Sequence, residues 1–151
     1  MNFAGRRKET PQTRAMSFPT IDKIMARDEI TLTPDQPIND AITVLLEHKV
    51  TGAPVLDKNR KIIGMITEKD CLRVLIDSAY HNMPFSDKNV SVYMSPVVKT
   101  VTTEHDLLDV ANEFLTTNFR KFPVVYKGTL VGQVSRRDVL RAIAEMNNTT
   151  W

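Results

Sequence analysis

The sequence predicts a mixed α/β (α+β) protein built from two β-α-β-β-α repeats that pack with pseudo-two-fold symmetry. Three observations support this prediction: an internal repeat, a shared order of strand and helix periodicities, and a length of 151 residues. The copies align where Pro54 and Pro123 pair at a shift of 69 residues, and where Asp70 and Asp138 pair at a shift of 68. Because a repeat of roughly 60 residues buries only a marginal core by itself, we expect the copies to pack through their sheets.

Each copy contains the same elements in the same order. A short apolar turn and a β-branched stretch come first, followed by a helix in which apolar residues recur at i, i+3, i+4 and i+7. A hairpin and a second amphipathic helix complete the copy. The expected elements of the first copy are a turn ending at Met25, a strand at 30–33, a helix from Ile38, a hairpin at 54–66 and a helix on Leu72, Leu75 and Ile76. Those of the second copy are a turn ending at Met94, a strand at 97–102, a helix from Leu107, a hairpin at 123–134 and a helix on Leu140, Ile143 and Ala144.

Composition divides the chain into a charged tail and two repeats. The tail holds Arg6, Arg7, Lys8 and Arg14 against Glu9, a local charge of +3, and the rest of the chain sums to −1, which together give the net charge of +2. The repeats therefore lack the large basic face that nucleic-acid binding requires, and we expect no such partner. The predicted organisation is a basic N-terminal tail at 1–19, repeat 1 at 20–77, a linker at 78–88, repeat 2 at 89–146 and a C-terminal tail at 147–151.

Several classes of protein are excluded by the sequence. No apolar run approaches the roughly 18 residues of a membrane span, and the N-terminus lacks a secretory signal. The single cysteine, Cys71, cannot form an internal disulfide, which fits a cytoplasmic protein. The three histidines have no Cys or acidic companions at metal-ligand spacing, so we expect no metal site.

A Gly-x-x-Thr/Ser-x-x-Asp motif follows the hairpin in both copies, as Gly64 to Asp70 and Gly132 to Asp138. One interpretation is a capping box, in which a hydroxyl and a residue three places later bond each other's main-chain amides at a helix start. Two features argue against it: Asp is shorter than the usual Glu or Gln, and cations occupy a first helical turn whose dipole disfavours them. The other interpretation is a ligand site. A carboxylate matches the two hydroxyls of a ribose, while the neighbouring cations Lys69, Arg136 and Arg137 suit a phosphate.

The segment before each hairpin proline is the second candidate feature. Val50-Thr51-Gly52-Ala53 corresponds to Phe119-Arg120-Lys121-Phe122 in the second copy. Gly52 allows a flat ring to approach the backbone closely. The alternative is a simple junction between a loop and a strand, with Arg120 and Lys121 at a solvated edge.

These motifs resemble those of the cystathionine β-synthase (CBS) domain family, and the resemblance covers residues 20–146 as a stand-alone pair of CBS domains, a Bateman module. It implies two clefts between the repeats that bind AMP, ADP, ATP or S-adenosylmethionine, with no cofactor required. One cleft would combine Met65, Thr67 and Asp70 with Thr100, Phe119, Arg120 and Lys121. The other would combine Gln133, Ser135, Arg136, Arg137 and Asp138 with Thr31, Val50, Thr51, Gly52 and Ala53. Gln133 departs from the family pattern, where an apolar residue covers the base.

The resemblance further implies a homodimer and a regulatory protein that senses an adenosine-containing ligand and acts on an unidentified partner. We expect no enzyme, because the sequence has no phosphate-binding loop, zinc-helix His pair or activated nucleophile. Three alternatives stay open: an S-adenosylmethionine sensor, a dinucleotide sensor, or a protein or nucleic-acid docking module whose clefts are empty.

Overall fold

The computed structural model describes residues 17–27, 29–82, 88–96 and 99–150, with the side chains of 149 and 150 left out. The basic residues of the predicted tail, residues 83–87 of the predicted linker and Trp151 lie outside the described residues. The chain folds as a mixed α/β protein, which confirms the predicted class. It divides into two compact units. We call them the first-repeat unit, from residues 28–99 and 127–130, and the second-repeat unit, from the rest of the described chain.

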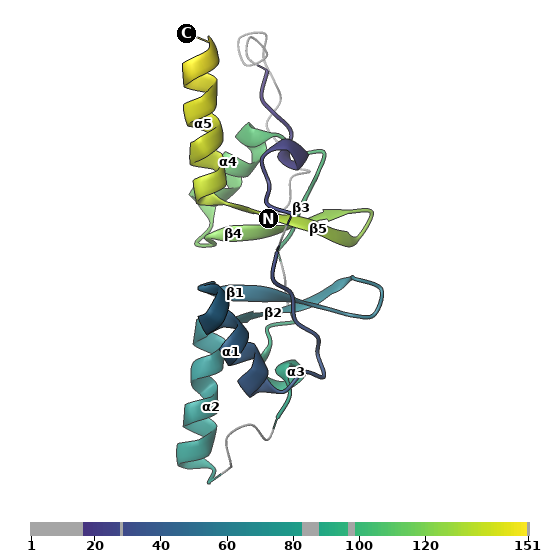
Figure 1. Cartoon of the computed structure of the whole chain (residues 1–151), viewed down its shortest axis with the longest axis vertical. Helices are drawn as coiled ribbons and strands as arrows, with labels where there is room; N and C mark the ends of the chain where they lie inside the picture. The colour runs from purple at the N-terminus through teal and green to yellow at the C-terminus, as the bar shows by residue number, and fades with distance from the viewer. Residues whose placement is uncertain (1–16, 28, 83–87, 97–98, 151) are drawn as a thin grey trace. The chain divides into compact units, whose positions relative to one another are not determined.

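The first-repeat unit carries a two-stranded sheet with two long helices on one side (Figure 1). Strand β1 (Gly52–Leu56) pairs with β2 (Ile62–Thr67) as an antiparallel hairpin in which Gly52 lies opposite Thr67. The stretch before the first helix joins this sheet through one parallel bridge between Leu32 and Val55. The helices are α1 (Ile38–His48), α2 (Glu68–Tyr80) and the short α3 (Val90–Tyr93).

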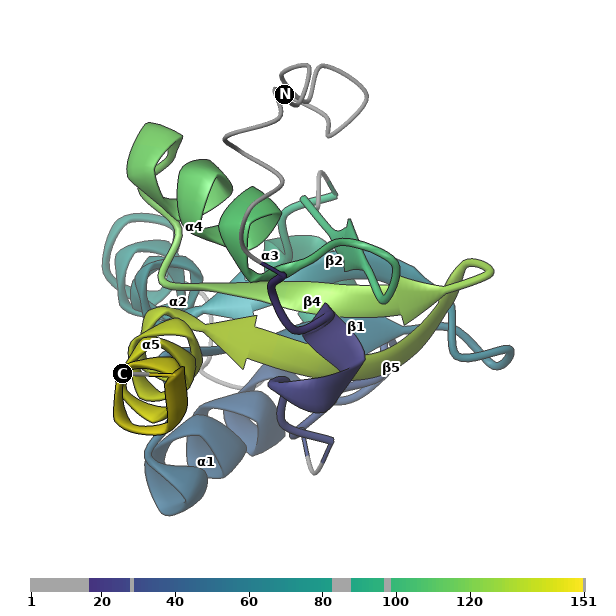
Figure 2. The same ribbon diagram turned by 90° about the horizontal axis from the view of Figure 1, so that it is seen from above.

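The second-repeat unit has the same plan, with a three-stranded sheet in the order β3-β4-β5. Figure 2 shows β4 and β5 of this sheet side by side. Val101 pairs with Val124 in parallel. These residues are the counterparts, 69 positions later in the sequence, of Leu32 and Val55, which form the parallel bridge of the first-repeat unit. The two units therefore share one register, as the repeat predicts. The elements are a 3-10 turn (Ile21–Lys23), β3 (Val101–Thr102), α4 (Leu107–Thr116), β4 (Lys121–Tyr126), β5 (Thr129–Ser135) and α5 (Arg136–Thr150).

The leading segment of each repeat packs on the other repeat's strands and helices. Residues 17–27 belong to the second-repeat unit, where Ala26 and Gln133 exchange two main-chain hydrogen bonds of 2.8 and 2.9 Å. Residues 88–96 belong to the first-repeat unit, where Ser95 and Met65 do the same at 2.9 and 3.0 Å. The compact units consequently differ from the contiguous repeats expected along the sequence.

The motif glycines permit this close approach. A Cβ at Gly132 would lie 2.6 Å from the Ala26 carbonyl oxygen, and one at Gly64 would lie 2.7 Å from the Ser95 carbonyl oxygen. Both distances are shorter than real Cβ contacts allow. The two glycines are therefore required by packing, whatever a ligand needs.

Each unit has its own hydrophobic core, and the exchanged segment contributes to it. Ile21 is fully buried among residues of α4, α5 and the β3-β4-β5 sheet. Val90 is fully buried in the corresponding cluster of the first-repeat unit. Because a repeat of this size has a marginal core, the segment donated by the other repeat adds apolar burial that each unit needs.

The helices run further than the sequence suggested. Helix α2 continues to Tyr80, into the predicted linker, and α5 continues to Thr150, through most of the predicted C-terminal tail. Neither extension contains Pro or Gly, so nothing local ends the helix. Among the described residues no helix has the length and apolar character to cross a membrane.

Candidate functional site

The start of α2 is a complete capping box. The Thr67 hydroxyl oxygen accepts from the Asp70 main-chain N–H at 3.2 Å, and Asp70 Oδ2 accepts from the Thr67 N–H at 3.0 Å. The Thr67 hydroxyl also lies 3.0 Å from the same carboxylate oxygen and donates to it. Asp70 is buried, with 9% of its surface exposed.

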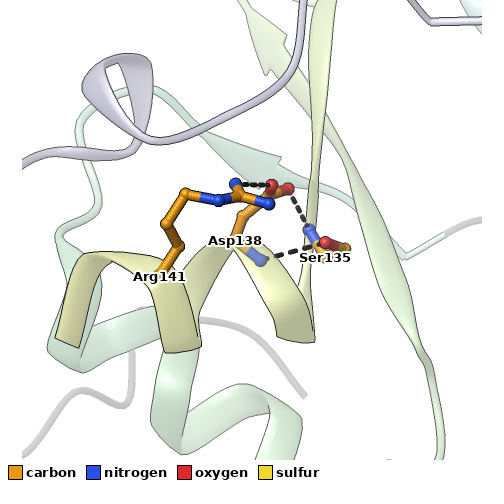
Figure 3. Close-up of polar contacts among 3 residues, drawn as sticks. All are labelled: Ser135, Asp138 and Arg141. Atoms are coloured by element: carbon orange, nitrogen blue, oxygen red, sulfur yellow. Dashed lines mark hydrogen bonds and ion pairs between the residues drawn. The ribbon is translucent and has the colours of Figure 1, made fainter. Parts of the chain in front are cut away.

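The start of α5 repeats this arrangement (Figure 3). Asp138 Oδ2 accepts from the Ser135 main-chain N–H at 2.8 Å, and the Ser135 hydroxyl oxygen accepts from the Asp138 N–H at 3.1 Å. Arg141, one turn along the helix, donates to Asp138 Oδ1 at 3.0 Å. The cap and this ion pair together fix the orientation of the carboxylate.

A third capping box shows that this geometry does not require a ligand. At the start of α4, Asp106 and Asp109 bond each other's main-chain N–H groups at 3.0 and 3.1 Å. The expectation that Asp is too short for the reciprocal bond was therefore wrong, since an Asp completes it at three helix starts. The reason is geometric: with an extended cap residue, the Asp carboxylate reaches the cap amide directly.

Capping leaves one oxygen of each motif carboxylate outside the cap. Within the described chain, Asp70 Oδ1 has no hydrogen-bond partner. Asp138 Oδ1 accepts from the exposed Arg141, and a carboxylate oxygen has room for a second donor. A capping role and a role in holding a hydroxyl are thus compatible in the same side chain.

The segments before the hairpins lie beside these helix starts within each unit. The Thr51 carbonyl oxygen accepts from the Glu68 N–H at 3.0 Å, and the Arg120 carbonyl oxygen accepts from the Arg136 N–H at 3.2 Å. Arg136 Nε also donates to the Phe119 carbonyl oxygen at 3.1 Å. The structure thus brings Thr51 to the Asp70 motif and Arg120 to the Asp138 motif. The crossed pairing of each motif with the opposite repeat stays a prediction.

Gly52 and its neighbours have structural reasons for their identity. A Cβ at Gly52 would lie 2.9 Å from the Ile66 carbonyl oxygen of the adjacent strand, so pairing of β1 with β2 already favours glycine. Ala53 is fully buried in the core. Thr31 and Thr100 are half-buried and occupy equivalent positions, each directly before the residue that begins the parallel pairing.

The predicted phosphate-binding cations differ in their surroundings. Lys69, Arg136 and Arg137 are exposed in the first turns of their helices. Lys121 is half-buried, and burial lowers the pKa of its ammonium group. An anion beside Lys121 would offset this penalty because it would stabilise the charged form.

Gln133 is the one predicted site residue with an unmet hydrogen-bonding requirement in the part of the chain that the structure describes. It is 7% exposed, and its Oε1 is buried with no hydrogen-bond partner among the described residues. Its main chain is satisfied by Ala26, so the deficit belongs to the side-chain amide alone. The corresponding residue in the first repeat, Met65, has no side-chain amide to satisfy.

Two cavities lie at places that sequence reasoning did not indicate. One of about 170 Å³ lies between α1 and α2. Its walls are mostly aliphatic and include Val50 from the predicted site, together with Cys71 and Glu68. Burial raises the pKa of the Cys71 thiol, and the carboxylates of Asp70 and Glu68 raise it further.

A second cavity, of about 480 Å³, lies in the second-repeat unit and is lined by Thr20, Asp22, Met25, Arg27, Thr103, Glu104, Tyr126 and Val131.

The sequence contained no signal for the larger cavity, because its walls come from segments far apart in the chain. The described residues contain no group of three or more His, Cys, Asp or Glu side chains arranged to hold a metal ion.

The chain matches the family model of the CBS domain twice, over residues 21–77 and 88–145. Together with the duplicated fold, this shows that the chain belongs to the CBS domain family, as the resemblance predicted. Protein MJ1225 of Methanocaldococcus jannaschii is 32% identical over 123 residues, which cover 82% of this chain and 42% of that protein. The chain thus spans less than half the length of that relative.

Solved structures show the same similarity. The crystal structure of CBSX2, a protein of Arabidopsis thaliana, in complex with AMP is 30% identical with a TM-score of 0.74, covering 85% of this chain and 98% of that one. The CBS domain pair of protein MJ0100, solved with 5′-methylthioadenosine and S-adenosyl-L-methionine, is 24% identical with a TM-score of 0.69, covering 85% of this chain and 98% of that one. At that identity the second similarity establishes only the fold.

Proposed function

We propose that this CBS pair is a regulatory module that binds an adenine nucleotide at the start of α5, in the second-repeat unit. The observation that carries the proposal is the Asp138 carboxylate, which caps the helix through Oδ2 and presents Oδ1 beside an exposed arginine. CBSX2, which is similar over nearly its whole crystallised length, binds AMP. The proposal includes no catalytic step.

Each part of the nucleotide has a candidate partner. Asp138 and Ser135 would hold the ribose hydroxyls, since a carboxylate accepts from both members of a diol. Arg136 and Arg137 are exposed at the same helix start and would pair with phosphate. The equivalent α2 start, with Thr67, Asp70 and Lys69, is a candidate for a second, weaker site, since it has one cation fewer.

Isothermal titration with AMP, ADP, ATP and S-adenosylmethionine tests the proposal. Asp138→Asn keeps an oxygen that can accept the capping bond but removes the charge, so we expect AMP binding to weaken by about 1.5 to 3 kcal/mol. Asp109→Asn is the matched control, because it makes the same change in a capping box that we assign no ligand. Equal AMP affinity in the two variants would show that Asp138 is a helix cap alone.

A homodimer is the second part of the proposal. Exposed aliphatic residues recur at equivalent positions of both units, with Leu72 and Leu75 on α2 matching Leu140 and Ile143 on α5. Single exposed apolar residues are ordinary, but a row on one helix face favours a partner surface. The same face occurs twice per chain, which suits pairing with a second copy. The protein regulated by this module is a separate, unidentified partner.

A further inference from the structure

The amide of Gln133 lacks a partner that its burial requires. A buried polar atom without a hydrogen bond costs free energy, because water no longer satisfies it. Oε1 of Gln133 is such an atom among the described residues, although the main-chain groups of the same residue are paired with Ala26. The first repeat avoids this cost by placing Met65 at the corresponding strand position.

The strand geometry places this amide next to the proposed nucleotide site. Side chains alternate along a strand, so Gln133 and Ser135 of β5 share one face and are about 7 Å apart. Val134 between them points to the opposite face and is fully buried in the hydrophobic core. Gln133 is therefore on the strand face that leads to the Ser135 and Asp138 cap.

We infer that Gln133 is a specificity-determining residue that reads the 6-amino group of an adenine ring bound at the α5 start. The inference rests on the proposed function. A glutamine amide has an acceptor and a donor side by side, which match the 6-amino group and N7 of adenine. On this edge a 6-oxo purine has two acceptors, O6 and N7, so it leaves Oε1 without a donor. The unit should consequently prefer AMP to IMP.

The test compares AMP and IMP affinities in the full-length wild-type chain and in Gln133→Met, which installs the side chain of the first repeat. We expect the wild type to bind AMP more tightly than IMP by a factor between about 5 and about 150, the range for one bidentate contact to a base. The variant should lose most of this ratio, mainly through weaker AMP binding. Its ligand-free form should melt at a higher temperature than the wild type, since the unpaired amide is gone.

Gln36→Met is the matched control. It makes the same chemical change at an amide whose Oε1 already accepts from the Thr33 N–H at 3.3 Å, outside the proposed site. The AMP to IMP ratio should stay at the wild-type value. AMP binding with the same ratio in wild type and Gln133→Met would overturn this inference alone. Absence of AMP binding by the wild type would overturn the proposed function and this inference with it.

Discussion

At the scale of single residues, one carboxylate oxygen is committed to the helix cap while the other stays available to a ligand. Asp70 and Asp138 both follow this division. Asp109 forms the same type of cap and shows that the cap stands on its own. The charge of a motif carboxylate also affects its neighbours: that of Asp70 contributes to the raised pKa of the Cys71 thiol.

The reactivity of Cys71 provides a test of this electrostatic environment. Burial and the charges of Asp70 and Glu68 raise its thiol pKa, so the reactive thiolate should be scarce at neutral pH and alkylation slow. Glu68→Gln removes one negative charge, lowers the pKa and should speed reaction with iodoacetamide at pH 7. Mass spectrometry of the modified chain measures the rate, and the sole cysteine makes the assignment unambiguous.

Lys69→Gln is the control for this experiment, since Lys69 lies beside Glu68 on the exposed side of the helix and is not among the groups that shift the thiol. Its alkylation rate should match that of the wild type. If Glu68→Gln reacted no faster than the wild type, Glu68 would not contribute, and burial with the charge of Asp70 would account for the raised pKa.

At the scale of elements, the exchange of leading segments is the least expected feature of this fold. Each segment pairs with the final strand of a hairpin through two main-chain hydrogen bonds and adds a fully buried residue to the core. The first residue of each motif must be a glycine, because the main chain of the leading segment passes too close to it for a Cβ atom to fit. This contact links the N-terminal part of the chain to the strand that carries Gln133.

Gly132→Ala tests the exchange directly. The added Cβ would collide with the Ala26 carbonyl oxygen, so the segment must shift, and we expect a loss of about 1 to 3 kcal/mol in the free energy of unfolding. Gly64→Ala should behave in the same way in the other unit. Urea denaturation measures both losses.

Ser91→Ala is the control for the exchange, because Ser91 is exposed on α3 and the change adds no atoms. Its stability should differ from the wild type by at most about 0.5 kcal/mol. Wild-type stability in both glycine variants would mean that the leading segments move aside without cost and contribute little to the fold.

At the scale of the whole molecule, duplication gives the chain two copies of the motif helix cap, at Asp70 and Asp138, and two similar helix surfaces. The exposed aliphatic faces of α2 and α5 follow from this duplication. Their residues are not needed by either internal core, since α2 and α5 use other positions, such as Val74 and Val139, for that purpose.

Substitution on these faces tests the proposed dimer. Leu75→Glu combined with Ile143→Glu places a charge on both equivalent faces, so we expect a protein that elutes with the mass of one chain where the wild type has the mass of two. Light scattering after size-exclusion chromatography measures the mass. Lys58→Glu, at an exposed turn position, is the control and should leave the dimer intact. A wild-type chain that is already monomeric would contradict the proposal.

The duplication, the element order, the fold class and the family could all be predicted from the sequence alone. Such features depend on local periodicity and on spacing along the chain, as the matching bridges Leu32 to Val55 and Val101 to Val124 illustrate. The motif at Asp70 and Asp138 was also visible, although its two interpretations could not be separated, because spacing does not reveal which atoms of a carboxylate are engaged.

Three further findings required the folded structure: these carboxylates cap their helices, the motif glycines allow a segment to cross closely, and Oε1 of the Gln133 amide is buried without a partner among the described residues. The caps depend on which carboxylate atoms bond the main chain, the glycines on a contact between residues distant in sequence, and the Gln133 amide on the solvent exposure of one atom. The physical reason is that hydrogen bonding and burial are properties of three-dimensional neighbours, which periodicity along a chain does not specify.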